Sequence, residues 1–140
     1  MMAVGRIMGL DVGDKRIGIA LSDLLMLTAQ GKETYQRREL QADLDYLAQT
    51  AKENNVVKFV CGLPKNMNGT LGEQAEKTQE FADALSEHTG IPVEFFDERL
   101  TSASAHKTLL EADMSRKKRK QVVDKLAAVY ILQGYMDAHR

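Results

Sequence analysis

The sequence lacks several features that would each indicate a particular class of protein. Its 140 residues include one cysteine, which excludes an internal disulfide, and no tryptophan. The only prolines are Pro64 and Pro92, and no linker rich in proline or glycine divides the chain. No apolar stretch approaches the roughly 20 residues that a membrane span needs, and the N-terminus has no apolar signal-peptide core. We therefore expect a single domain over residues 1–140 that is soluble, cytoplasmic and without a membrane partner.

The charges are unevenly distributed although they nearly cancel. The formal net charge of the whole chain is −1. Residues 1–98 contain 10 basic and 16 acidic residues, a net charge of −6, whereas residues 99–140 contain 9 basic and 4 acidic, a net charge of +5. An asymmetry of this kind is typical of chains with a charged interaction surface. The near-neutral total therefore does not exclude a nucleic-acid partner.

Hydrophobic periodicity predicts an α/β fold. Alternating apolar residues predict strands, and apolar residues three and four positions apart predict helices. The expected elements are, in order, strands over 6–11, 16–22 and 31–36, a helix over 39–53, a strand over 56–61, a helix over 71–88, a strand over 92–96, and helices over 102–112 and 121–137. The first three strands should form an antiparallel meander, with the later strands parallel to the first. We expect a mixed five-stranded sheet with helices on both faces.

Three carboxylates lie where strands end or a helix begins. Asp11 closes an apolar strand between Gly9 and Gly13, Glu98 follows another strand, and Asp124 lies in the last helix. Each has a structural interpretation: a hairpin cap for Asp11, a salt bridge for Glu98, and a first-turn acid for Asp124. If the three instead converge at one sheet edge, their oxygens suit Mg²⁺ or Mn²⁺. Two such ions would hydrolyse a phosphodiester without a covalent nucleophile.

Cations accompany these acids. Residues 116–120 are five consecutive cations directly before the helix of Asp124, and they are either a solvated loop or a phosphate-binding segment. The few aromatic residues do not alternate with this run, so contacts to the nucleic-acid backbone are favoured over base stacking. Asn66 and Asn68 either form a turn or hydrogen-bond a nucleotide. The candidate nucleic-acid-binding residues are Lys15, Arg16, Asn66, Asn68, Arg99, Thr101, Arg116, Lys117, Lys118, Arg119 and Lys120.

Five stretches together resemble a known family. They are GLDVGDKRIGIA (9–20), GLPKNMNG (62–69), DERLTS (97–102), SRKKRK (115–120) and VDKLAA (123–128). In this order and spacing they are similar to the YqgF/RuvX family of ribonuclease H-like proteins, relatives of the RuvC Holliday-junction resolvases. The resemblance implies a ribonuclease H-like fold with Asp11, Glu98 and Asp124 as the catalytic, metal-binding triad. It also implies a cytosolic nuclease that uses Mg²⁺ or Mn²⁺.

The substrate implied by this resemblance is the 5′ end of pre-16S ribosomal RNA, with pre-rRNA favoured over branched DNA. Ribosomal precursor particles are a candidate partner, and the protein would act as a monomer or a homodimer. One alternative is a Holliday junction resolvase. Another is a non-catalytic nucleic-acid-binding module, because the strand ending near Cys61 lacks the carboxylate that RuvC resolvases carry there. A third is an ATP-handling enzyme, whose phosphate-binding hairpin has similar glycines but which closes two lobes around its nucleotide.

Overall fold

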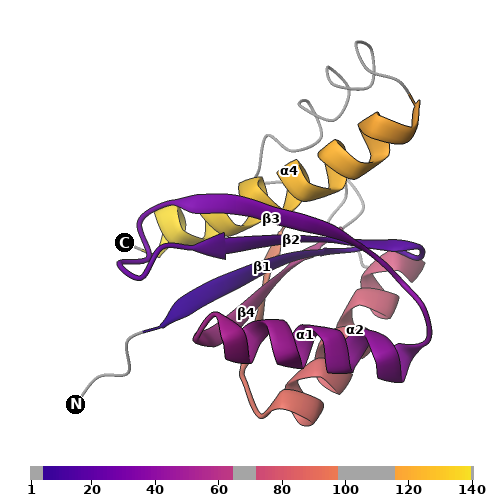
Figure 1. Ribbon diagram of the computed structural model, residues 1–140, viewed down its shortest axis with the longest axis horizontal. Coiled ribbons are helices and arrows are strands. Elements are labelled where there is room, and N and C mark those ends of the chain that lie inside the picture. Colours follow the sequence, from indigo (N-terminus) through magenta and orange to yellow (C-terminus); the bar gives the residue numbers. More distant parts are fainter. Residues whose placement is uncertain (1–4, 65–71, 98–115, 140) are drawn as a thin grey trace.

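A five-stranded sheet forms the frame of the protein (Figure 1). The computed structural model describes residues 5–64, 72–97 and 116–139, and for 116–124 it describes the backbone alone. The elements are β1 (Arg6–Val12), β2 (Arg16–Ser22), β3 (Ala29–Gln36), α1 (Leu40–Glu53), β4 (Val56–Leu63), α2 (Glu73–Thr89), β5 (Val93–Asp97) and α4 (Arg116–Ala138).

The strands are arranged in the order β3-β2-β1-β4-β5. β1 pairs antiparallel with β2, and β2 with β3, as a hairpin followed by a third strand. β4 lies parallel to β1, and β5 parallel to β4. Helices α1 and α2 cover one face of the sheet and α4 covers the other (Figure 1). The predicted mixed sheet with helices on both faces is therefore confirmed.

Each face of the sheet buries its own apolar core. Side chains along β1 alternate between the two cores, as in any strand: Met8 and Leu10 lie with α1 and α2, whereas Ile7 lies with α4. On the first face the helices contribute Leu44, Leu47, Ala51, Phe81, Ala82 and Leu85. On the second face α4 contributes Ala128, Ile131, Leu132, Tyr135 and Met136. Because these residues recur at helical spacing, each helix presents an apolar stripe that covers its face of the sheet.

Helix α4 approaches β1 very closely at Gly9. A Cβ atom at this position would lie 2.7 Å from Cβ of Leu132 and 3.0 Å from the carbonyl oxygen of Ala128. The obstacle on one side is backbone, which cannot move without shifting the helix. Gly9 therefore determines how deeply α4 sits on the sheet.

Polar contacts anchor the C-terminal half of α4. Lys58 Nζ lies 2.9 Å from a carboxylate oxygen of Glu94, to which Tyr135 also donates a hydrogen bond. These two partners, Tyr135 first, hold the pKa of Glu94 below its ordinary value. The side chain of Gln133 accepts the Ala29 N–H at 2.9 Å. The helix is thus fixed to both β5 and the beginning of β3.

Several predicted boundaries were wrong: β4 ends at Leu63 rather than at 61, and α2 begins at Glu73 rather than at 71. α4 begins at Arg116 rather than at 121, so the basic run is helical and is not a loop before the helix. Lysine and arginine are good helix formers, and no glycine or proline interrupts this segment. β3 begins at Ala29 rather than at 31, because Ala29 pairs with Ser22 and its N–H donates a hydrogen bond to Gln133 of α4.

The predicted helix over 102–112 lies outside the described residues. In the part of the chain that the structure describes, no helix is long and apolar enough to cross a membrane.

Replacement of Gly9 by alanine should destabilise the protein by about 1–3 kcal/mol, the usual cost of overpacking a tight interface. Urea unfolding followed by circular dichroism measures this. Gly31→Ala is the control, because a Cβ there would meet only the Lys125 side chain, which can rotate away. The close approach at Gly9 is refuted if both variants unfold at the wild-type urea concentration.

Candidate functional site

The carboxyl ends of β1, β4 and β5 lie at one edge of the sheet. The parallel registers pair Leu10 with Cys61 and Leu63 with Asp97, so the three strands end side by side. Ligand sites in sheets of this type gather at that edge. Asp11 is there, next to the end of β1. Glu98 directly follows β5 and lies outside the described residues, as do Asn66, Asn68, Arg99 and Thr101.

Asp11 lies on the sheet face that α4 covers. It is two residues beyond Gly9, and along a strand such residues share a face. Its neighbour across the hairpin is Gly18, which pairs with it in β2 and adds no side chain. The carboxylate is partly buried. Gly18 therefore places no side chain beside Asp11, whereas the space at Gly9 is filled by α4.

Cys61 lies near this carboxylate but takes no part in acid–base chemistry. Burial raises the pKa of its thiol to about 12, and the negative charge of Asp11 adds to the shift. A thiol with such a pKa stays neutral at physiological pH and is a poor nucleophile. Cys61 is fully buried in the core shared with α1 and α2, which confirms the prediction that it is a small core residue.

The backbone brings Asp124 toward the same edge. Ile7, at the start of β1, packs in the core of Ile131 and Tyr135, whereas Gly9 meets Leu132 and Ala128. Moving along β1 toward its carboxyl end therefore corresponds to moving back along α4. Asp124 is one helical turn before Ala128, in the direction of Asp11. The structure does not describe the Asp124 side chain.

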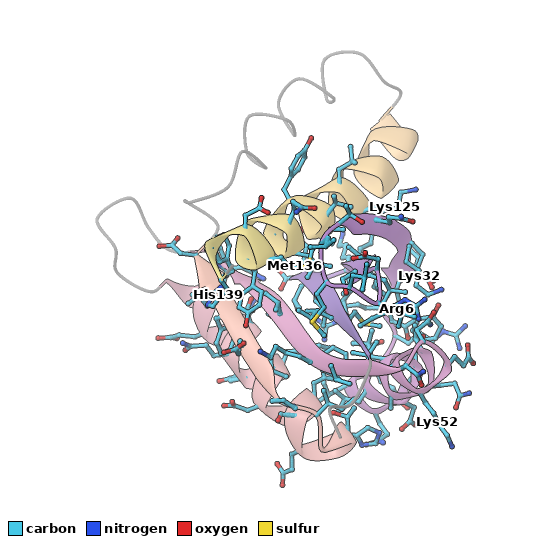
Figure 2. The ribbon with its side chains drawn as sticks, turned by 90° about the vertical axis from the view of Figure 1, so that its left-hand side faces the viewer. Arg6, Lys32, Lys52, Lys125, Met136 and His139 are labelled. Carbon is cyan, nitrogen blue, oxygen red and sulfur yellow. The ribbon has the colours of Figure 1, made fainter. Side chains whose placement is uncertain are left out.

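Lys15 and Arg16, two of the predicted cations, lie at this edge. Lys15 is exposed in the turn between β1 and β2, and Arg16 begins β2. Residues 116–120 form the first turns of α4, again with the backbone alone described. Lys125 was not predicted: its side chain packs against Gly31 of β3, on the same side of the molecule as Lys32 (Figure 2). Its position in the VDKLAA stretch could have identified it as a candidate.

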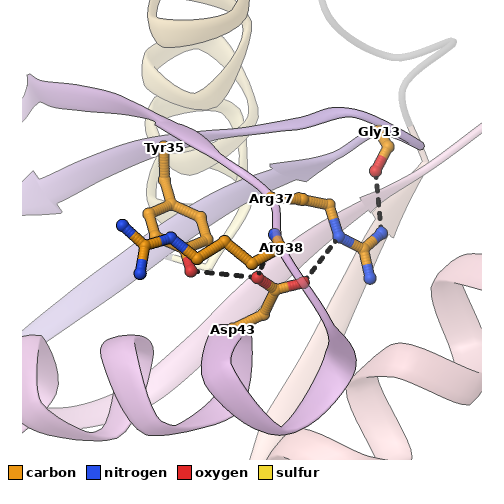
Figure 3. A network of polar contacts seen from close by, with 5 residues as sticks. All are labelled: Gly13, Tyr35, Arg37, Arg38 and Asp43. Carbon is orange, nitrogen blue, oxygen red and sulfur yellow. Dashed lines mark hydrogen bonds and ion pairs between the residues drawn. The ribbon is translucent and has the colours of Figure 1, made fainter.

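A buried carboxylate that was not predicted is connected through Arg37 to the turn between β1 and β2. Asp43, in the first turn of α1, is 0% exposed. Its Oδ1 accepts hydrogen bonds from Tyr35 Oη and the Arg38 N–H, both at 2.9 Å, and its Oδ2 accepts one from Arg37 Nε at 3.0 Å (Figure 3). Arg37 Nη1 in turn donates to the Gly13 carbonyl oxygen at 2.9 Å. The signal was Asp43 itself, an acid on the apolar stripe of its helix.

The described residues alone do not assemble a metal site. Among residues 5–64, 72–97 and 125–139, no group of three histidine, cysteine, aspartate or glutamate side chains is placed to hold a metal ion. Of the predicted triad, only the Asp11 side chain belongs to these residues. The triad stays a prediction. The structure describes Asp11 in full, only the backbone of Asp124, and nothing of Glu98.

Comparison with known proteins places the chain in a family. The model of the RuvX family, described as a Holliday junction resolvase, matches residues 5–138. A Clostridioides difficile protein named "Putative pre-16S rRNA nuclease" is 59% identical over 136 residues, 97% of this chain and 96% of the relative. A Syntrophomonas wolfei protein of the same name is 60% identical over 132 residues, 94% of each chain.

Solved structures show the same fold at low sequence identity. Thermus thermophilus RuvC in complex with a Holliday junction substrate superposes with a TM-score of 0.59 at 10% identity, over 96% of each chain. The yeast mitochondrial Holliday junction resolvase Ydc2 gives 0.52 at 11% identity, over 97% of this chain and 79% of that one. The predicted ribonuclease H-like fold is confirmed. By sequence over nearly its whole length, the chain belongs to the RuvX family.

Proposed function

We propose that this protein is a metal-dependent nuclease that processes the 5′ end of pre-16S ribosomal RNA in the cytoplasm. The observation that carries the proposal is the partly buried Asp11 carboxylate at the carboxyl edge of the sheet, flanked by glycines on the face that α4 covers. The family and the names of close relatives support the same reaction class. The single domain would act as a monomer or a homodimer on ribosomal precursor particles.

Asp11, Glu98 and Asp124 would hold the metal ions. Carboxylate oxygens are the ligands that Mg²⁺ and Mn²⁺ prefer. Cys61 is buried in the core on the other face of the sheet, so the proposed donor set is all-oxygen. When bound, one or two such ions lower the pKa of an attacking water and stabilise the leaving oxygen of a phosphodiester. The three carboxylates would orient this chemistry, and Gly18, which pairs with Asp11 and has no side chain, would let the substrate backbone approach.

The first turns of α4 would hold substrate phosphates. Helices α1 and α2 have acids in their first turns, whereas the described backbone of α4 begins with five cations and no acid. The helix dipole repels cations at its N-terminus, so this arrangement is unfavourable until an anion is bound. A phosphate beside residues 116–120 would interact with both the cations and the dipole.

Replacement of Asp11 by asparagine should reduce metal-dependent cleavage by about 100-fold or more, because a ligand charge is lost without a change in shape. The substrate is an RNA with the 5′ leader joined to the start of 16S rRNA, assayed with Mg²⁺ and Mn²⁺. The matched control is Asp14→Asn, since Asp14 lies three residues away, is exposed, and faces Lys77 at 3.6 Å.

The outcomes separate the candidate functions. Cleavage of the RNA by wild type and by Asp14→Asn, with none by Asp11→Asn, supports the proposal. Preferred cleavage of a four-way DNA junction would instead favour a resolvase, as the family description says. Binding without cleavage of either substrate by wild type would favour a non-catalytic module. Equal cleavage by Asp11→Asn and wild type contradicts the assigned role of Asp11.

Replacement of both Lys117 and Lys118 by alanine should weaken RNA binding and make it less sensitive to salt. Each phosphate contact on a single strand contributes roughly 0.7 to the slope of log K against log salt, so the slope should fall by about 1.4. Fluorescence anisotropy at several KCl concentrations measures it. Lys52→Ala, in the last turn of α1, should leave the slope unchanged. An unchanged slope in the double variant would place the basic run outside the interface.

A further inference from the structure

The turn that follows Asp11 has its carbonyl groups held from several sides. The Gly13 N–H donates to the Arg16 carbonyl oxygen at 2.9 Å, which closes the turn on itself. Arg37 contributes two more hydrogen bonds, each of 2.9 Å. Its Nη1 donates to the Gly13 carbonyl oxygen, and its backbone N–H donates to the Lys15 carbonyl oxygen. From α2, Gln74 Nε2 donates to the Val12 carbonyl oxygen at 3.3 Å. Four hydrogen bonds therefore hold the backbone around this turn, whereas turns are usually among the more mobile parts of a fold.

Arg37 is itself held in place. Its Nε donates to the fully buried Asp43 at 3.0 Å, and its guanidinium lies 5.0 Å above the ring centre of Phe81. Asp43 is in turn oriented by Tyr35 and Arg38 through its other oxygen (Figure 3). The planar guanidinium therefore has one orientation, in which separate nitrogens face Asp43 and the turn.

Net stability alone does not account for this arrangement. A buried ion pair contributes little net stability, because desolvation of the two charges offsets their attraction. What the pair does achieve is geometric: it ties the first turn of α1 and the end of β3 to the turn bearing Lys15 and Arg16. Those two cations are the candidate phosphate ligands nearest to Asp11 in the sequence. Their backbone position depends on Arg37.

We propose that Arg37, oriented by Asp43, is a positioning residue that fixes the turn over residues 13–16 so that Lys15 and Arg16 meet the phosphates of the substrate. It acts through the turn and does not itself contact the nucleic acid. The inference rests on the proposed nucleic-acid binding at this edge. A rigid turn lowers the entropy cost of binding, so loss of Arg37 should weaken affinity more than it slows the chemical step.

The test is a cycle of four proteins: wild type, Arg37→Lys, the pair Lys15→Ala with Arg16→Ala, and the combined variant. Lysine keeps the charge opposite Asp43, but its single ammonium does not replace two separately placed nitrogens. Arg37→Lys should weaken RNA binding about tenfold in the wild-type background. In the background without the two turn cations it should change binding less than about twofold, because coupled residues are not additive.

A second readout does not depend on RNA. Hydrogen exchange at the Gly13 amide should become at least about tenfold faster in Arg37→Lys. The amide of Phe59, which donates to the Pro92 carbonyl oxygen elsewhere in the sheet, should keep its rate relative to global unfolding. If Arg37→Lys fails to fold, the variant Arg37→Met with Asp43→Asn removes both charges together while Oδ1 of residue 43 still accepts from Tyr35 and Arg38.

Leu85→Ala is the control for stability alone. Leu85 is fully buried in the same core as Phe81, so its truncation should lower the unfolding midpoint without changing the Kd for RNA. Equal weakening by Arg37→Lys in both backgrounds, or an unchanged Gly13 exchange rate, overturns the inference. If wild type binds no RNA, the proposed function fails, and the exchange measurement alone still decides whether Arg37 holds the turn.

Discussion

The close approach of α4 to β1 is the constraint on which the rest of the structure depends. Because Gly9 has no side chain, the backbone of Ala128 comes within contact distance of β1. A bulkier residue at position 9 would push α4 away from the sheet and shift the part of the helix before Ala128. Asp124 and the basic residues 116–120 lie in that part of α4. One absent side chain therefore sets the distance between a strand-end carboxylate and the segment proposed to complete its site.

The second constraint is the burial of Asp43 on the opposite face. A charge without exposure to water must be fully paired, and here its oxygens receive three hydrogen bonds. The partners come from the end of β3 and the segment that leads into α1, so the pairing also orients the turn beside Asp11. The two faces of the sheet thus contribute differently to the same edge. We propose that α4 brings Asp124 and the basic run to this edge, and that the Arg37–Asp43 pair fixes the turn between β1 and β2.

The sequence predicted β1 and β2 well, because strands buried on both faces are short, mostly apolar runs bounded by turn residues. It failed for the start of α4, since a run of cations resembles a solvated loop and only the continuous helical backbone distinguishes the two. Asp11 was identified because a carboxylate that ends an apolar strand is unusual. Arg37 and Asp43 were missed: Asp43 lies on the apolar stripe of its helix, but its partner Arg37 follows β3, and no local pattern indicates that the two side chains pair.

The central claim is that α4, seated on Gly9, delivers Asp124 to the same metal site as Asp11. Calorimetric titration with Mn²⁺ tests it most directly, using wild type, Asp11→Asn, Asp124→Asn, the double variant, and Asp14→Asn as the control. If both carboxylates bind one site, each single replacement should remove most of the binding heat and the double variant should lose little more. Wild-type Mn²⁺ affinity in Asp124→Asn, together with loss of binding in Asp11→Asn, would contradict the account.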